Sequence, residues 1–200
     1  MLTAFIALGS NLPSPAGCPE ATLAAAVSRL ASLGRIANRS SLYSTRPVGF
    51  ADQPRFLNAV VVLETELAPH VLLDHLLAIE LEFGRDRSAG VPNGPRTLDL
   101  DILLMGDLSI HEPGLEIPHP RLAERAFVLI PLNEVAPHAI DPSHHKIVAQ
   151  LLQTLLSRSE SEAHAVVPIQ SDIWRAGTGS GAAGADVPSG AESGEPHPYR

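Results

Sequence analysis

The apolar and polar positions of residues 1–156 follow two different periods. Apolar residues at nearly every position predict buried strands over Leu2–Leu8 and Phe56–Thr65. Apolar residues at helical spacing predict two helices that begin at Pro19 and Pro69, where proline suits the first turn, and that end at glycines. Four further elements are expected, namely strands over Ile36–Thr45 and Thr97–Leu104 and helices near Glu124–Val135 and Lys146–Leu156.

This order of elements predicts the fold class. Strand, helix, strand, strand, helix, strand is the order of an α+β fold of the ferredoxin-like (split β-α-β) plan, a sandwich to which C-terminal helices are added. A chain of 200 residues suffices for one ordinary core, and we expect one domain over residues 1–156. Residues 157–200 hold six of the 15 glycines and become rich in Gly, Ala, Ser and Pro, which predicts a flexible tail.

The composition narrows the classes of partner. A net charge of -8 argues against broad binding to nucleic acid or to a membrane surface, so a bound anion must be held by a local cluster of cations. Cys18 is the single cysteine, which excludes an intrachain disulfide and a multi-cysteine metal site and fits a reducing compartment. Apolar runs of about five residues are too short to span a membrane. We expect a cytoplasmic protein.

Two carboxylates give the strongest chemical signal. Asp99 and Asp101 alternate with apolar residues in a predicted strand, so both side chains lie on one face of the sheet, with Cα atoms about 6.5 Å apart. At that separation their oxygens can share hard cations, and ligation by oxygen alone favours Mg²⁺ together with substrate phosphates. The alternative is an exposed edge strand whose acidic residues face water.

Arginines surround this pair in the sequence. Arg85 and Arg87 follow the second predicted helix, and Arg96 lies three residues before Asp99. Guanidinium groups so placed can hold a polyphosphate against metal ions. Arg85 and Arg87 could instead interact with the C-terminal end of the helix dipole. The chain has no Walker P-loop, so a nucleotide would have to be bound by metals and arginines.

Three other polar positions stand out. Glu80 lies on the apolar stripe of the second helix, where it either contacts a ligand or reaches water at the helix end. Asn58 alternates with Phe56 on one strand face, a pairing that suits a flat heterocycle but also occurs in ordinary cores. His119 stands between two prolines and could donate to a phosphate, although an isolated histidine is more often structural.

Together these motifs resemble the 6-hydroxymethyl-7,8-dihydropterin pyrophosphokinase family of folate biosynthesis. The resemblance covers residues 2–156 and implies the ferredoxin-like α+β fold. It also implies that ATP gives its β- and γ-phosphates together to the hydroxymethyl group of the pterin, releasing AMP. The motifs that carry it are Ala7-Leu8-Gly9-Ser10-Asn11, Arg55-Phe56-Leu57-Asn58-Ala59, Gly94-Pro95-Arg96-Thr97-Leu98-Asp99-Leu100-Asp101-Ile102-Leu103 and Pro118-His119-Pro120.

The resemblance also implies roles for single residues. Asp99 and Asp101 would ligate two Mg²⁺ ions, and Arg85 and Arg96 would act with them in catalysis. The positions that match the pterin pocket are Thr45, Val48, Phe56, Asn58 and Phe127. The positions that match the ATP site are Glu80, Arg85, Arg96, Ile102, His119 and Arg125. We expect a monomer with ATP and 6-hydroxymethyl-7,8-dihydropterin as its substrates.

Three positions depart from the family pattern, and two other functions stay open. Asn93 stands where one branch of the family has tryptophan, Pro120 where an aromatic residue is found, and Arg46 where proline is common. The fold would serve a non-catalytic ligand-binding module equally well. A conventional kinase that moves only the γ-phosphate could use the same metals and arginines.

Overall fold

The computed structural model describes residues 1–50, 52–86, 93–158 and 164–176. A six-stranded sheet forms its centre, with the order β10-β3-β4-β1-β5 and with β2 also paired to β4. All of these pairings are antiparallel. The strands are β1 (Leu2–Ser10), β2 (Arg35–Arg39), β3 (Leu42–Thr45), β4 (Phe56–Thr65), β5 (Asp99–Met105) and β10 (Val166–Ile169).

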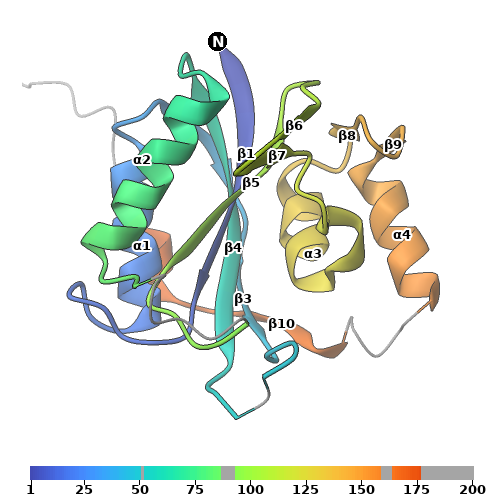
Figure 1. Ribbon diagram of the computed structural model, residues 1–200. Coiled ribbons are helices and arrows are strands. Elements are labelled where there is room, and N and C mark those ends of the chain that lie inside the picture. Colours follow the sequence, from blue (N-terminus) through green and yellow to red (C-terminus); the bar gives the residue numbers. More distant parts are fainter. Residues whose placement is uncertain (51, 87–92, 159–163, 177–200) are drawn as a thin grey trace, which may run out of the picture.

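Helices cover both faces of the sheet, as Figure 1 shows. α1 and α2 lie on one face, and α3 and α4 lie on the other. None of the helices in the described ranges is long and apolar enough to cross a membrane. The remaining elements are α1 (Pro19–Leu30), α2 (Pro69–Glu82), the hairpin β6 (Ile110–Glu112) and β7 (Leu115–Ile117), the 3-10 helix η1 (Leu122–Glu124), α3 (Ala126–Val135), the hairpin β8 (Ile140–Asp141) and β9 (Lys146–Ile147), α4 (Val148–Arg158) and α6 (Asp172–Ala176).

Alternate residues of the central strands supply two separate cores. In β4, Val61 belongs to the core beneath α1 and α2, whereas Val60 belongs to the core beneath α3 and α4. In β5, Leu100 and Ile102 join the first core. Because side chains alternate between the two faces of a strand, Asp99 and Asp101 must point toward the face that carries α3 and α4.

The strand expected over Ile36–Thr45 is interrupted. Residues 40 and 41 separate β2 from β3, and both strands pair with β4. At the break, the Ser40 hydroxyl accepts a hydrogen bond from the Val60 amide at 2.9 Å, while the Ser40 amide donates to the Val60 carbonyl. A side chain thus replaces part of the backbone ladder, and hydrophobic periodicity carries no signal for such a replacement.

The structure differs from the predicted flexible tail over residues 164–176. Here β10 pairs with β3, and α6 packs against α1. Trp174 is buried and its indole Nε1 donates to the Ser40 carbonyl at 2.9 Å. These elements are four and five residues long, too short for a periodic pattern to reveal. Residues 157 and 158, also assigned to the predicted tail, are the last two residues of α4, and residues 159–163 and 177–200 lie outside the described residues.

Candidate functional site

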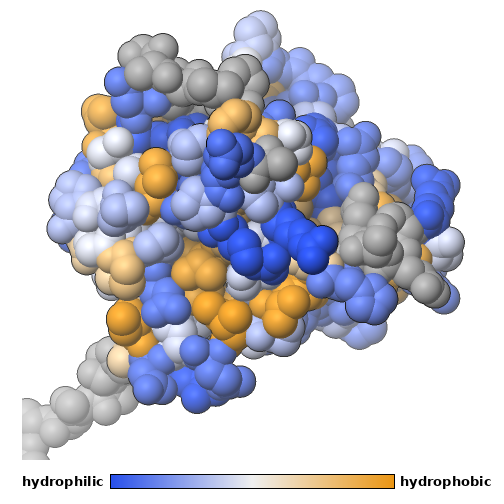
Figure 2. All heavy atoms as spheres, turned by 90° about the horizontal axis from the view of Figure 1, so that it is seen from below, coloured by the Kyte–Doolittle hydropathy of each residue, from blue (hydrophilic) through white to orange (hydrophobic). Residues whose placement is uncertain are grey.

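A hollow opens at the end of the sheet where β1 ends and where β4 and β5 begin. We call it the first hollow; residues of β1, β3, β4, β5 and α3 line it, together with the segments before η1 and before α3. This is the lower end of the molecule in Figure 1, and Figure 2 views it from below. Strongly hydrophilic side chains gather near the centre of that face, next to hydrophobic ones. The first hollow therefore offers an apolar wall and a charged wall.

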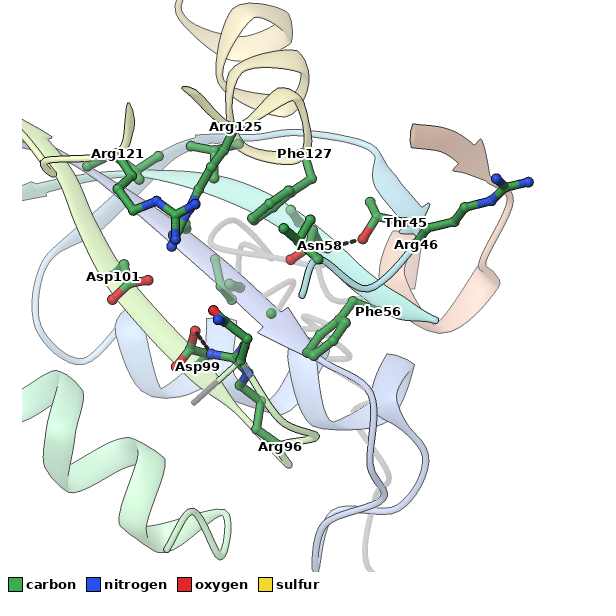
Figure 3. A pocket seen from close by; sticks show the side chains of 18 residues that line it. Thr45, Arg46, Phe56, Asn58, Arg96, Asp99, Asp101, Arg121, Arg125 and Phe127 are labelled. Carbon is green, nitrogen blue, oxygen red and sulfur yellow. Dashed lines mark hydrogen bonds and ion pairs between the residues drawn. The ribbon is translucent and has the colours of Figure 1, made fainter. Parts of the chain in front are cut away.

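The apolar wall carries an amide. Asn58 is 9% exposed, and its Nδ2 donates to the Thr45 hydroxyl at 2.7 Å (Figure 3). Phe56 and Phe127 approach from β4 and α3. A Cβ atom on Gly9 would lie 3.0 Å from Oδ1 of Asn58, tighter than ordinary contacts, so this position favours glycine. The arrangement can hold a flat ring between aromatic side chains and hydrogen-bond its edge.

The charged wall begins with the two carboxylates of β5. Arg96 Nη1 donates to Asp99 at 2.7 Å, and Arg85 Nη2 lies 3.8 Å from the same carboxylate. The Asp101 carboxylate makes no hydrogen bond or ion pair within the described ranges, although it lies near Arg125. One carboxylate is thus held by arginines, and the other remains available to a ligand.

Among the described residues, three arginines near the carboxylates have N–H groups without acceptors; Arg96 and Arg125 line the first hollow, and Arg85 lies 3.8 Å from Asp99 without lining it. Within the described part of the chain, the buried Nε atoms of Arg85, Arg96 and Arg125 have no hydrogen-bond partner. Burial lowers the pKa of Arg125, and the neighbouring Arg121 lowers it further. Buried N–H groups without acceptors cost free energy, so a cluster of them indicates a place where an anion binds.

His119 lies beside this cluster as a neutral ring. Burial, followed by the charge of Arg125, lowers its pKa to about 4. The backbone amide of Arg121 donates to His119 Nδ1 at 3.0 Å, which makes Nδ1 the acceptor and leaves the proton on Nε2. A neutral imidazole in this tautomer can donate one hydrogen bond to an anion.

A second hollow lies on the other side of β5 and shares Asp101 with the first. Its lining is mostly apolar and comes from α2, β5, β7 and the segment after β7. Ile102 and His119, both expected to contact nucleotide, belong to it. The main lining residues are Leu73, Leu77, Ile102, Leu115, His119 and Pro120.

Glu80 occupies a different position from the other expected residues, since it lines neither hollow. It is 1% exposed on α2, and its Oε1 accepts a hydrogen bond from the backbone amide of Leu100 at 2.8 Å. Leu100 lies between the two aspartates in β5. The carboxylate of Glu80 therefore holds the backbone that carries Asp99 and Asp101.

Two of the expected residues, Val48 and Arg87, are still to be placed. Val48 lines the rim of the first hollow and is 56% exposed. Arg87 lies outside the described residues. The structure thus brings Ile102 and His119 to the second hollow, Asp101 to both hollows and Arg85 to within 3.8 Å of the Asp99 carboxylate. The expected residues that line the first hollow are Thr45, Val48, Phe56, Asn58, Arg96, Asp99, Asp101, Arg125 and Phe127.

The sequence reasoning gave no role to several residues that build the site. Asn11 accepts a hydrogen bond from the Arg96 amide at 2.8 Å and donates to Gln53 and to the Pro54 carbonyl, which ties the loop before β4 to the loop before β5. Arg121 and Asn93 line the first hollow. An asparagine directly after a buried strand was the available signal for Asn11; Arg121 had only its closeness to His119.

The carboxylates fit a magnesium site of a particular kind. Within the described part of the chain, no three acidic, histidine or cysteine side chains are grouped as ligands for one metal ion. Mg²⁺ is commonly held by one or two carboxylates and completed by substrate phosphates and water. Asp99 and Asp101 meet that requirement, and the unpartnered arginine N–H groups beside them suit the phosphates.

Comparison with known proteins gives one consistent answer. Residues 5–137 match the family model described as 7,8-dihydro-6-hydroxymethylpterin-pyrophosphokinase. The 2-amino-4-hydroxy-6-hydroxymethyldihydropteridine pyrophosphokinase of Pseudomonas aeruginosa is 51% identical over 133 residues, which are 66% of this chain and 80% of that protein. The enzyme of the same name from Haemophilus influenzae is 44% identical over 153 residues, 76% of this chain and 92% of that protein.

Solved structures agree on the fold. The wild-type HPPK-DHPS protein of Plasmodium falciparum has a TM-score of 0.62 and 17% sequence identity, and the match covers 80% of this chain. This chain spans about half the length of that protein, 45%. The family model covers most of the chain, and two relatives match along most of their own length. The expectation drawn from the sequence motifs is confirmed, and the chain belongs to the 7,8-dihydro-6-hydroxymethylpterin-pyrophosphokinase family.

Proposed function

We propose that the two hollows divide the substrates of the family's reaction between them. In that reaction, ATP transfers its pyrophosphoryl group to the hydroxymethyl group of 6-hydroxymethyl-7,8-dihydropterin and AMP leaves; this is the activity of the chain in folate biosynthesis. The observation that carries the division is the position of Asp101, which borders both hollows at the point where they meet.

The first hollow takes the pterin. Its ring lies against Phe56 and Phe127, and the amide of Asn58 hydrogen-bonds its edge, with Thr45 fixing the orientation of that amide. Val48 covers the open side. Asn58 is only 9% exposed, so a ring that reaches its amide is itself largely removed from water. This burial supports the assignment of Asn58 to the pterin.

The second hollow takes the nucleoside of ATP. Its apolar lining suits an adenine ring beside Ile102, and His119 at its border can donate from Nε2 to a phosphate oxygen. The triphosphate then extends toward Asp101, which places its far end in the first hollow. Glu80 acts from behind β5, through the Leu100 amide, instead of touching the nucleotide.

Asp99 and Asp101 would hold the magnesium, which we propose to be two ions. When bound, Mg²⁺ neutralises phosphate charge and makes the attacked phosphorus more electrophilic. The chain's own cations do the rest. Arg85, Arg96 and Arg125 hold the phosphate oxygens, and the low exposure of their Nε atoms keeps competing water away. Positioning of the hydroxymethyl oxygen in line with the phosphorus supplies much of the rate.

The wider description of the protein follows the same proposal. The sheet order, in which β4 and β1 are central and β3 and β5 flank them, supports the ferredoxin-like plan with added C-terminal elements. We propose a pyrophosphokinase domain over residues 1–156, extended by the elements at 164–176. We propose that the protein works in the cytoplasm, which the single cysteine fits because it suits a reducing compartment, and that it works as a monomer.

Nucleotide analysis tests the proposal. The protein is mixed with Mg-ATP, with and without 6-hydroxymethyl-7,8-dihydropterin, and the nucleotides are separated. We expect AMP to form only with the pterin and in step with ATP loss. ADP would instead indicate a conventional kinase, and folded protein without turnover would indicate a binding module.

A further inference from the structure

We propose that Arg121 is a further phosphate-binding residue, which with Arg125 forms a clamp for the pyrophosphoryl group as it is transferred. This inference rests on the proposed function, because it assigns a ligand to the charged wall of the first hollow. The matched motifs give a phosphate role to Arg125 and none to Arg121. The case for Arg121 comes from its position and its surroundings.

The two guanidinium groups lie side by side. Arg121 comes from the segment between His119 and η1, and Arg125 stands at the start of α3. Figure 3 shows both side chains reaching from above into the same space, facing Asp101 across the first hollow. Both residues line that hollow, and neither lines the second one.

This placement sets two like charges against each other, with the carboxylates of Asp101 and Asp99 acting in the opposite sense on Arg125. Burial is the main cause that lowers the pKa of Arg125 and of His119, and the charge of Arg121 lowers both further, as expected for groups that repel at short range. The described ion pair of Arg121 is to Glu124 at 3.3 Å, with side chains 46% and 66% exposed, and an exposed pair of this kind stabilises little. An anion between the two guanidinium groups would turn repulsion into attraction.

The position also selects which phosphates are bound. Arg85 and Arg96 contact Asp99, at one end of the carboxylate pair, whereas Arg125 lies near Asp101 and beside Arg121. A polyphosphate over the carboxylates is thus flanked by cations at both ends. Because Arg121 borders only the first hollow, its partner is the part of the triphosphate that lies nearest the pterin, the β- and γ-phosphates.

Calorimetric binding of two nucleotides tests the clamp without requiring turnover. Mg-ATP and AMP are titrated into the wild-type chain and into Arg121→Gln, which keeps the size and polarity of the side chain and removes its charge. We expect the Kd of Mg-ATP to rise about tenfold, the loss of one charge-assisted interaction, and the Kd of AMP to change less than about twofold. Arg121→Lys should recover part of the loss.

Glu124→Gln is the matched control. It removes the partner of Arg121 on the solvent side and leaves the arginine charge in place, so ATP should bind as well as in the wild type or more tightly. The clamp is wrong if Arg121→Gln binds Mg-ATP as the wild type does, or if it weakens AMP and ATP equally. Failure of the proposed function looks different, since the wild-type chain would then bind ATP without forming AMP when pterin is added.

Discussion

The two faces of the central sheet are built from the same strands and yet do opposite things. Beneath α1 and α2, the apolar residues of β1, β4 and β5 form a continuous core, and the second hollow lies only at its edge, between α2 and β5. Beneath α3 and α4, the core stops short of one end of the sheet, and the first hollow with its arginines and carboxylates takes its place. The closed face gives the strands their stability, and the open face uses their fixed positions.

β5 shows how closely the two tasks are joined. Asp99 and Asp101 face the first hollow, while Leu100 between them is 1% exposed in the closed core. The backbone amide of Leu100 is held from the closed side by Glu80. Because this hydrogen bond holds β5 in place, the carboxylates of Asp99 and Asp101 are in position before the ligand arrives. Electrostatic catalysis requires charges that are positioned in advance.

Removing a carboxylate from the open face should have the largest effect on activity. For Asp101→Asn we expect kcat to fall by about 10²- to 10⁴-fold, because several kcal/mol of charge stabilisation are lost at about 1.4 kcal/mol per tenfold. The melting temperature should stay within about 2 °C, since the residue makes no ion pair in the described structure. Near-normal turnover at saturating Mg²⁺ would remove Asp101 from the mechanism.

The corresponding change on the closed face should reverse this pattern. Leu63→Ala empties a fully buried site in β4 and should lower the free energy of unfolding by about 2 to 5 kcal/mol. Turnover per folded molecule at a temperature well below melting should stay near the wild-type value. Urea unfolding and an assay corrected for the folded fraction measure the two quantities. A kcat that drops with no loss of stability would mean that the faces are not separable.

Substitution of Glu80 removes the hydrogen bond by which the closed face holds the strand that carries the carboxylates. Glu80→Leu removes the acceptor of the Leu100 amide and should cost about 1 to 3 kcal/mol in the free energy of unfolding. Because β5 is then less firmly held, the apparent Mg²⁺ requirement should rise as well. Glu80→Gln retains an acceptor oxygen and should recover most of the magnesium response. If both variants respond to Mg²⁺ as the wild type does, the hydrogen bond of Glu80 contributes to stability alone and does not position the carboxylates.

The smallest effect concerns pH. The pKa of His119 is lowered from its ordinary 6.5 to about 4 in the folded chain, chiefly by burial. Between these values the unfolded chain binds the proton first, so falling pH should reduce the free energy of unfolding, by about 1 kcal/mol after allowance for solvent screening. His119→Gln should flatten this part of the stability profile. Unfolding measured at pH 7 and near pH 4.5 in both chains checks it, and equal slopes would contradict the lowered pKa.

What the sequence predicted well depends on local pattern. Alternation along β5 was enough to put Asp99 and Asp101 on one face, and the helical spacing located α1 and α2 within a few residues. The break at Ser40 and the addition of β10 depend on pairing between distant segments, which no local period records. The same limit applies to Glu80, whose partner belongs to another element.

The pairing of β1 with β5 has one irregularity. Ile6 lies opposite Ile102, but the next pair along the strands is Phe5 with Leu104, so Leu103 is an extra residue. This β-bulge shifts the pairing register by one residue between the half of β5 that carries the carboxylates and the far half. A one-residue slip in the pairing of the half that carries Asp99 and Asp101 would turn both acids toward the core beneath α1 and α2 and turn leucines toward the ligand. The extra residue at Leu103 separates that half from the rest of the strand. The far half of β5 can therefore shift its pairing with β1 by one residue without turning Asp99 and Asp101 away from the first hollow.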